Sequence, residues 1–109
     1  MKLILCVVIF IFINACEDEN NQIRDITIIS PENNSTVSLD IDIECIIPED
    51  IDKVELFING ESTNIFDDEK PFDLVWNTRN YIDGPYTLHI EGIENNGEIL
   101  RSNKTNITL

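Results

Sequence analysis

The stretch VSLDIDIECII, residues 37–47, decides the fold class because apolar and polar residues alternate along it. Successive side chains of a β-strand point to opposite faces, so the pattern predicts a strand with one buried and one solvated face. The predicted inward residues are Val37, Leu39, Ile41, Ile43, Cys45 and Ile47. The outward residues are Ser38, Asp40, Asp42 and Glu44.

Shorter segments with the same alternation lie on both sides of this stretch. They are ITIIS (26–30), KVELFIN (53–59), PFDLVWN (71–77), PYTLHIEGI (85–93) and a last strand that ends within residues 105–109. Pro, Gly, Asn and Asp separate them, and Asn59-Gly60 is a typical hairpin turn. With no segment of helical periodicity, the chain is predicted to be all-β, an antiparallel sandwich of about seven strands.

The order of the turns and aromatic residues carries a resemblance to a known family. SPENNSTVS, VELFING, PFDLVWNT and DGPYTLHIEGIENNGE follow one another in residues 30–98. This succession resembles the bacterial immunoglobulin-like (Big) domain of secreted and surface proteins, over residues 26–109. The resemblance implies an immunoglobulin-like β-sandwich, which we place at residues 23–109. One departure is Glu94-Asn95-Asn96-Gly97, where many members have an Asp-x-x-Gly-Asn turn.

The N-terminus begins with eleven apolar residues, 3–13. They are too few to cross a bilayer, which takes about 20 helical residues. Lys2 precedes the run and the small residue Ala15 ends it, which is the layout of a signal peptide at residues 1–15. We therefore expect these residues to be removed.

The next residue is a cysteine, and INAC (13–16) resembles the lipobox of bacterial lipoproteins. The resemblance implies that acyl chains such as palmitate are attached to Cys16 and hold the protein on a membrane. The alternative is an incidental cysteine beside an ordinary cleavage site. CEDENNQ (16–22) is predicted to be an acidic, disordered spacer, and it resembles the surface-export sequence of some Bacteroidota lipoproteins. The expected location is the bacterial cell envelope, at the outer membrane or cell surface.

The charge of the chain limits its partners. Removal of residues 1–15 takes away Lys2 and no acid, which leaves six basic and 21 acidic residues and a formal charge of −15. Such a surface disfavours nucleic acid and anionic lipid headgroups. The remaining 94 residues suffice for one domain, which we expect to be monomeric. Cys45 has no partner for a disulfide if Cys16 is lipidated, whereas an unlipidated Cys16 could pair with it.

No catalytic constellation is visible in the sequence. His89 is the only histidine, and it is predicted to be exposed on the outward face of its strand without an orienting partner. Cys45 falls on an inward-facing position of its predicted strand, where a cysteine acts as a small apolar residue. We therefore expect no catalytic residue, no cofactor and no metal site, and a non-enzymatic protein.

Several residues could serve binding instead. Asp40, Asp42 and Glu44 share a strand face and could attract calcium, but alternate strand residues lie about 6–7 Å apart, so a solvated acidic face is favoured. Trp76 and Tyr86 could stack on a sugar, but both fall on inward-facing positions of their strands, which favours a place in the core. Phe57, Phe66 and Tyr81 remain as surface aromatics.

We expect a binding or spacer domain whose ligand, a protein or a carbohydrate, would be held by loops. The expected loops are NIFDDEKPF (64–72) and NTRNYIDG (77–84). Binding should then depend more on Phe66, Asp67, Asp68, Arg79 and Tyr81 than on the acidic strand face. The alternative function is a surface adhesin or glycan-binding module with a loop-borne site, with or without calcium.

Overall fold

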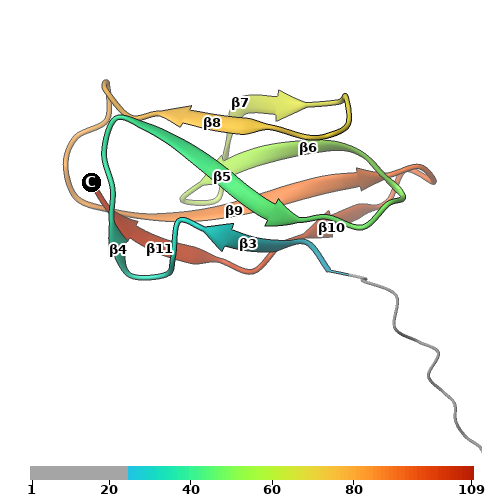
Figure 1. Cartoon of the computed structure of the whole chain (residues 1–109), viewed down its shortest axis with the longest axis horizontal. Helices are drawn as coiled ribbons and strands as arrows, with labels where there is room; N and C mark the ends of the chain where they lie inside the picture. Colours follow the sequence, from blue (N-terminus) through green and yellow to red (C-terminus); the bar gives the residue numbers. More distant parts are fainter. Residues whose placement is uncertain (1–24) are drawn as a thin grey trace, which may run out of the picture.

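The computed structural model describes residues 25–109, and these residues are all-β, without a helix. The predicted signal peptide, Cys16 and the acidic spacer lie outside the described residues. Nine strands follow one another (Figure 1): β3 (Thr27–Ser30), β4 (Ser35–Thr36), β5 (Asp40–Ile46), β6 (Ile51–Ile58), β7 (Glu61–Asp67), β8 (Leu74–Asn77), β9 (Pro85–Glu94), β10 (Ile99–Arg101) and β11 (Thr105–Thr108). Residues 25–109 contain no helix with the length and hydrophobicity needed to span a membrane.

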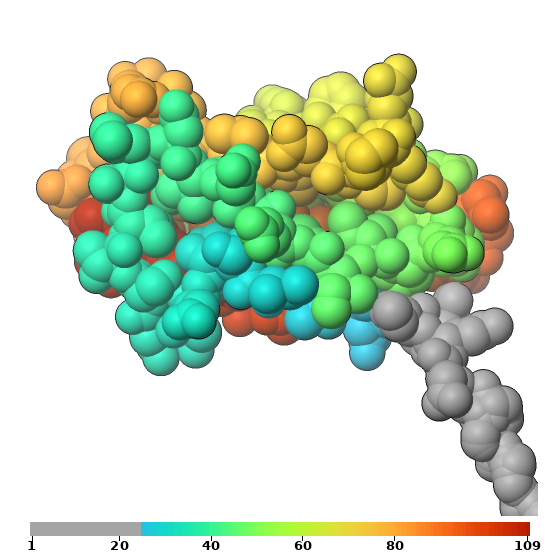
Figure 2. Space-filling model, in the orientation of Figure 1, coloured from blue at the N-terminus to red at the C-terminus, as the bar shows by residue number. Residues whose placement is uncertain are grey.

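The strands form two sheets that pack face to face. The larger sheet has the order β4-β11-β9-β6-β7, with β10 also paired to β9, and the smaller has the order β3-β5-β8. All pairs are antiparallel except β4 and β11, which run parallel. In Figure 2 the smaller sheet and its loops cover most of the larger one. The predicted all-β sandwich is confirmed.

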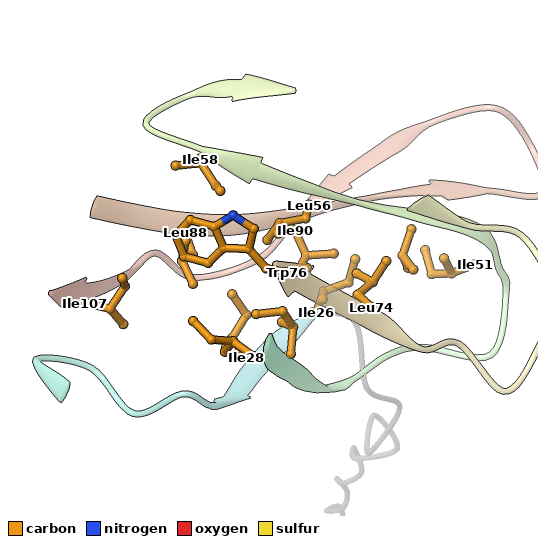
Figure 3. Packing of buried hydrophobic residues seen from close by; sticks show 13 residues of the cluster. Ile26, Ile28, Ile51, Leu56, Ile58, Leu74, Trp76, Leu88, Ile90 and Ile107 are labelled. Atoms are coloured by element: carbon orange, nitrogen blue, oxygen red, sulfur yellow. The ribbon is translucent and has the colours of Figure 1, made fainter. Parts of the chain in front are cut away.

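The core between the sheets is centred on Trp76, which is fully buried. Figure 3 shows its indole among side chains of both sheets, namely Leu56, Ile58, Leu88 and Ile90 from the larger and Ile28 from the smaller, together with Ile26 just before β3. Every buried apolar residue of the cluster lies between Ile26 and Ile107. The described segment therefore has a complete hydrophobic core of its own.

The alternation that predicted the central strand holds within β5 but fails just before it. Ile41 and Ile43 are buried as expected, and Cys45 and Ile47 are half-buried against the core. Leu39, predicted to point inward, is 59% exposed, so that prediction is wrong. Its φ is +65°, outside the extended region, and the two-residue alternation applies only to extended backbone. The sheet pairing of β5 starts one residue later, at Asp40.

Strand β7 occupies residues that the sequence assigned in part to a loop, 64–72. It runs beside β6 at the edge of the larger sheet, and its pairing is shifted by a bulge where Asn64 has a φ of +63°. The hydroxyl of Thr63 donates to the carbonyl of Leu56 at 2.7 Å, which fixes the bulge. The loop before β8 is therefore shorter than expected.

Two strands, β10 and β11, pair one after the other with the same edge of β9, and residues 102–104 interrupt them. At the interruption, Ser102 forms hydrogen bonds with β9 in place of regular strand pairing. Its N–H donates to the carbonyl of Ile90 at 2.8 Å, and its Oγ accepts from the N–H of Ile90 at 2.8 Å. The break is thus fixed by hydrogen bonds, and it leaves a hollow beside β9.

Candidate functional site

The hollow beside β9 is a groove of about 500 Å³ on the larger sheet. Its lining comes from β9, from the turn after β6 and from the interruption between β10 and β11: Asn59, Gly60, Thr87, His89, Glu91, Arg101, Ser102 and Lys104. The groove combines polar and basic groups, and it is our candidate functional site.

His89 lies on the outer face of β9, as its parity predicted, but it is only 7% exposed. Phe57 stands directly opposite on β6, and the two rings are stacked with centroids 4.9 Å apart. Glu91 is its polar partner, at 3.1 Å from Nε2. The prediction of an exposed histidine without a partner is therefore wrong, because long side chains on the neighbouring positions cover the ring.

Glu91 links His89 to a guanidinium. Its Oε2 accepts hydrogen bonds from His89 Nε2 and from Arg101 Nε, the latter at 2.9 Å, and its side chain is 15% exposed. Burial acts to raise the pKa of this carboxyl, but the hydrogen bonds and charges of His89 and Arg101 outweigh burial and hold the pKa below its ordinary value. Glu91 is therefore ionised at neutral pH and fixes the direction of Arg101.

The groove gathers two of the five basic residues in 25–109, Arg101 and Lys104. Lys104 forms no ion pair or hydrogen bond with any of the described residues. The other three basic side chains are engaged elsewhere in the fold: Lys53 with the Phe66 ring at 4.3 Å, Lys70 with the carbonyl of Glu49, and Arg79 with Asp40 at 2.8 Å. The groove is thus a cationic spot on an acidic protein.

The two loops expected to hold a ligand, 64–72 and 77–84, lie at opposite ends of β8 (Figure 1). Phe66 and Asp67 belong to β7. The carboxylate of Asp67 accepts from the N–H groups of Glu69 and Asp73 at 3.0 and 2.8 Å, so it organises its own loop. Asp67 therefore already has a structural role, and the two loops lie apart as separate candidate surfaces.

The aromatic residues near the other loop pack on one another. The rings of Trp76 and Tyr81 meet edge to face at 5.0 Å, and those of Tyr81 and Tyr86 at 5.7 Å. The Tyr86 hydroxyl donates to the carbonyl of Ile82 at 2.6 Å. The predicted core role of Trp76 is confirmed, and Tyr86 is half-buried against the core as its parity predicted.

The acidic face of β5 does not converge on one point. Asp40, Asp42 and Glu44 are exposed at alternate positions, and Asp40 is paired with Arg79. Within residues 25–109 no three His, Cys, Asp or Glu side chains are grouped so that they could hold a metal ion. The structure thus offers calcium no preformed site on this face.

Cys45 should react slowly with thiol reagents in the native protein. Burial, and secondarily the charge of Glu44, raise the pKa of its thiol from 9.0 to about 11. The reactive thiolate is then about a hundredfold scarcer at pH 7. Alkylation by iodoacetamide of a chain that starts at Glu17, in which Cys45 is the only cysteine, should therefore accelerate strongly in urea. Equal rates in native and unfolded protein would contradict the burial of Cys45.

Comparison with known proteins identifies the fold independently. The family model described as a bacterial Ig domain matches residues 25–90. No curated protein matches the chain. Among solved structures, the fibronectin(III)-like modules of Clostridium thermocellum CbhA are 21% identical with a TM-score of 0.65, over 76% of this chain and 92% of that one.

The endo-beta-1,4-mannanase of Thermotoga petrophila is 12% identical with a TM-score of 0.59. The match covers 84% of this chain but only 20% of the mannanase. At such identities both structures show a shared sandwich fold and nothing about chemistry.

Proposed function

This chain belongs to the bacterial Ig domain family, and from this we propose that it is a non-enzymatic, lipid-anchored module of the bacterial cell envelope that acts as a binding or spacer domain. Bacterial Ig domains are typically extracellular or surface-associated, and domains of this kind are generally non-catalytic. The proposed location is the outer membrane or the cell surface.

The observation that carries the proposal is the position of Cys16. It follows an apolar run too short for a membrane span, and it stands directly after Ile13-Asn14-Ala15, as in a lipobox. Lipidation with several acyl chains would give lasting attachment, since one chain alone binds a bilayer only marginally. The acidic residues after Cys16 would then separate the folded domain from the membrane.

The test compares two cysteine variants of the full chain in a bacterial host. Wild type and Cys6→Ala should fractionate with membranes and show acylation of Cys16 by mass spectrometry. Cys16→Ala should lose the acyl mass and leave the membrane fraction or remain uncleaved. Cys6→Ala is the matched control because it removes a thiol inside the apolar run. An unmodified N-terminus at Glu17 or later in the wild type would refute the anchor.

A second candidate, a surface glycan-binding module or adhesin, is favoured by the groove beside β9. The groove is polar and basic, and hydrogen bonds link three of its lining side chains, His89, Glu91 and Arg101. A spacer domain needs no such feature.

A further inference from the structure

We propose that the groove beside β9 binds a carboxylate-bearing sugar residue, with Arg101 and Lys104 holding the carboxylate. The inference rests on the binding role proposed above and names its ligand class. It does not depend on the lipid anchor. Four features of the groove support it: a guanidinium paired with Glu91, a free ammonium, neutral polar groups and the charge of the surrounding surface.

Arg101 is oriented by a chain of contacts that begins in the sheet. Phe57 stacks on His89, His89 bonds to Glu91, and Glu91 accepts from Arg101 Nε. The two terminal nitrogens of Arg101 form no hydrogen bond with residues 25–109. A guanidinium held at Nε, with its terminal N–H groups available, is suited to bind a carboxylate through two parallel hydrogen bonds.

Lys104 supplies a second positive charge at the edge of the same groove. Its loop is fixed on both sides, because Ser102 is bonded to Ile90 and Thr105 is buried in β11. The ammonium has no partner in the described part of the chain. Binding of an anion would therefore break no existing ion pair of Lys104.

The groove lining also offers uncharged groups, on Asn59 and Thr87. The Asn59 side-chain oxygen accepts from the Thr87 N–H at 3.0 Å, so the Asn59 amide nitrogen remains available as a donor. The Thr87 hydroxyl donates to Asn106 at 2.9 Å and keeps its lone pairs as acceptors. A donor and an acceptor beside a cationic pair match the hydroxyls of a sugar that also carries a carboxylate.

The charge of the whole protein selects a ligand with one anionic group. The chain has a formal charge of −14, which repels polyanions such as nucleic acid or a multiply charged peptide. Within the groove Glu91 is compensated by Arg101, while Lys104 remains uncompensated. Glu55 lies opposite Glu91 on β6, outside the groove lining, and accepts from Ser62. The net attraction is therefore local and suits a single carboxylate on a largely neutral molecule.

The test is an NMR titration of the chain that starts at Glu17, which contains the complete core. The probes are methyl glucuronide, methyl glucoside and sulfate. Methyl glucuronide should give saturable shifts at the amides of Asn59, Thr87, His89 and Lys104, and methyl glucoside, which lacks the carboxylate, should not. Lys104→Gln should weaken glucuronide binding about tenfold. Lys70→Gln, which changes the net charge equally but lies outside the groove, should leave it unchanged.

Three results would overturn the inference. One is the absence of groove shifts with glucuronide, and another is equal binding by the Lys104→Gln and Lys70→Gln variants. The third is sulfate binding as tight as glucuronide, which would reduce the groove to a general anion site. None of these results bears on Cys16, so failure of the groove and failure of the anchor can be told apart.

Discussion

Replacing Trp76 with alanine should lower the free energy of unfolding by about 3–5 kcal/mol, the usual cost of truncating a fully buried aromatic side chain. The indole fills the centre of the core and contacts both sheets (Figure 3). It also forms edge-to-face pairs with Tyr81 and Tyr86. Urea unfolding of the chain that starts at Glu17, followed by circular dichroism, measures the change. A loss below about 1 kcal/mol would contradict the central position of Trp76.

Trp76→Phe is the matched variant, because it keeps an aromatic ring and removes the indole N–H. That N–H is buried and has no acceptor among residues 25–109, and an unpaired buried donor costs about 1–3 kcal/mol. The phenylalanine variant should therefore lose clearly less stability than its reduced volume alone implies. A loss as large as that of Trp76→Ala would contradict the expected relief from removing an unpaired N–H.

The sequence predicted the parts of the fold that depend on burial of one strand face. Ile41 and Ile43 on β5, and Leu88 and Ile90 on β9, are buried as the alternation indicated. Trp76 was placed in the core for the same reason. In a two-layer sandwich these inward positions must be apolar, so the residues at alternate positions of the sequence indicate which face is buried.

The predictions that failed concern residues whose exposure is set by backbone conformation or by neighbouring side chains, and not by the inward–outward alternation of a strand. Leu39 has a left-handed backbone conformation, to which the alternation of an extended strand does not apply. Strand β7 escaped detection because an edge strand with a bulge carries a weak apolar pattern. Of its half-buried residues, Thr63, Ile65 and Asp67, only Ile65 is apolar. His89 was expected to be exposed, since alternation gives the face of a residue but not the size of the side chains beside it.

The groove was missed for a further reason. His89 and Glu91 could be assigned to one face, but the sequence does not reveal that β10 places Arg101 opposite Glu91. It also gives no indication that a break in the strand brings Lys104 to the same hollow. Cross-strand register brings these residues together, and register depends on turns and bulges that short motifs specify poorly.

Gly92→Val should destabilise the domain by about 1–3 kcal/mol or more, the usual range for overpacking a core. Gly92 is a buried residue of β9, and a Cβ added there would lie 2.7 Å from Cδ1 of Ile26 and 3.1 and 3.2 Å from two methyl groups of Ile51. A glycine inside a strand often marks such a close approach. Valine adds two further methyl groups to this space. Urea unfolding at the stability of the wild type would refute the contact.

Gly92→Ala separates the steric contact from the general effect of glycine in a strand. Alanine restricts the unfolded chain, which favours folding by up to about 1 kcal/mol, while its Cβ meets the end of the Ile26 side chain. Ile26→Val removes the Cδ1 atom that is approached most closely. Alone it should cost about 0.5–1.5 kcal/mol, but beside Gly92→Ala it should cost less or even stabilise. Additive effects in this double-mutant cycle would mean that Ile26 does not limit the space at Gly92, because coupling appears only between residues that share the contact.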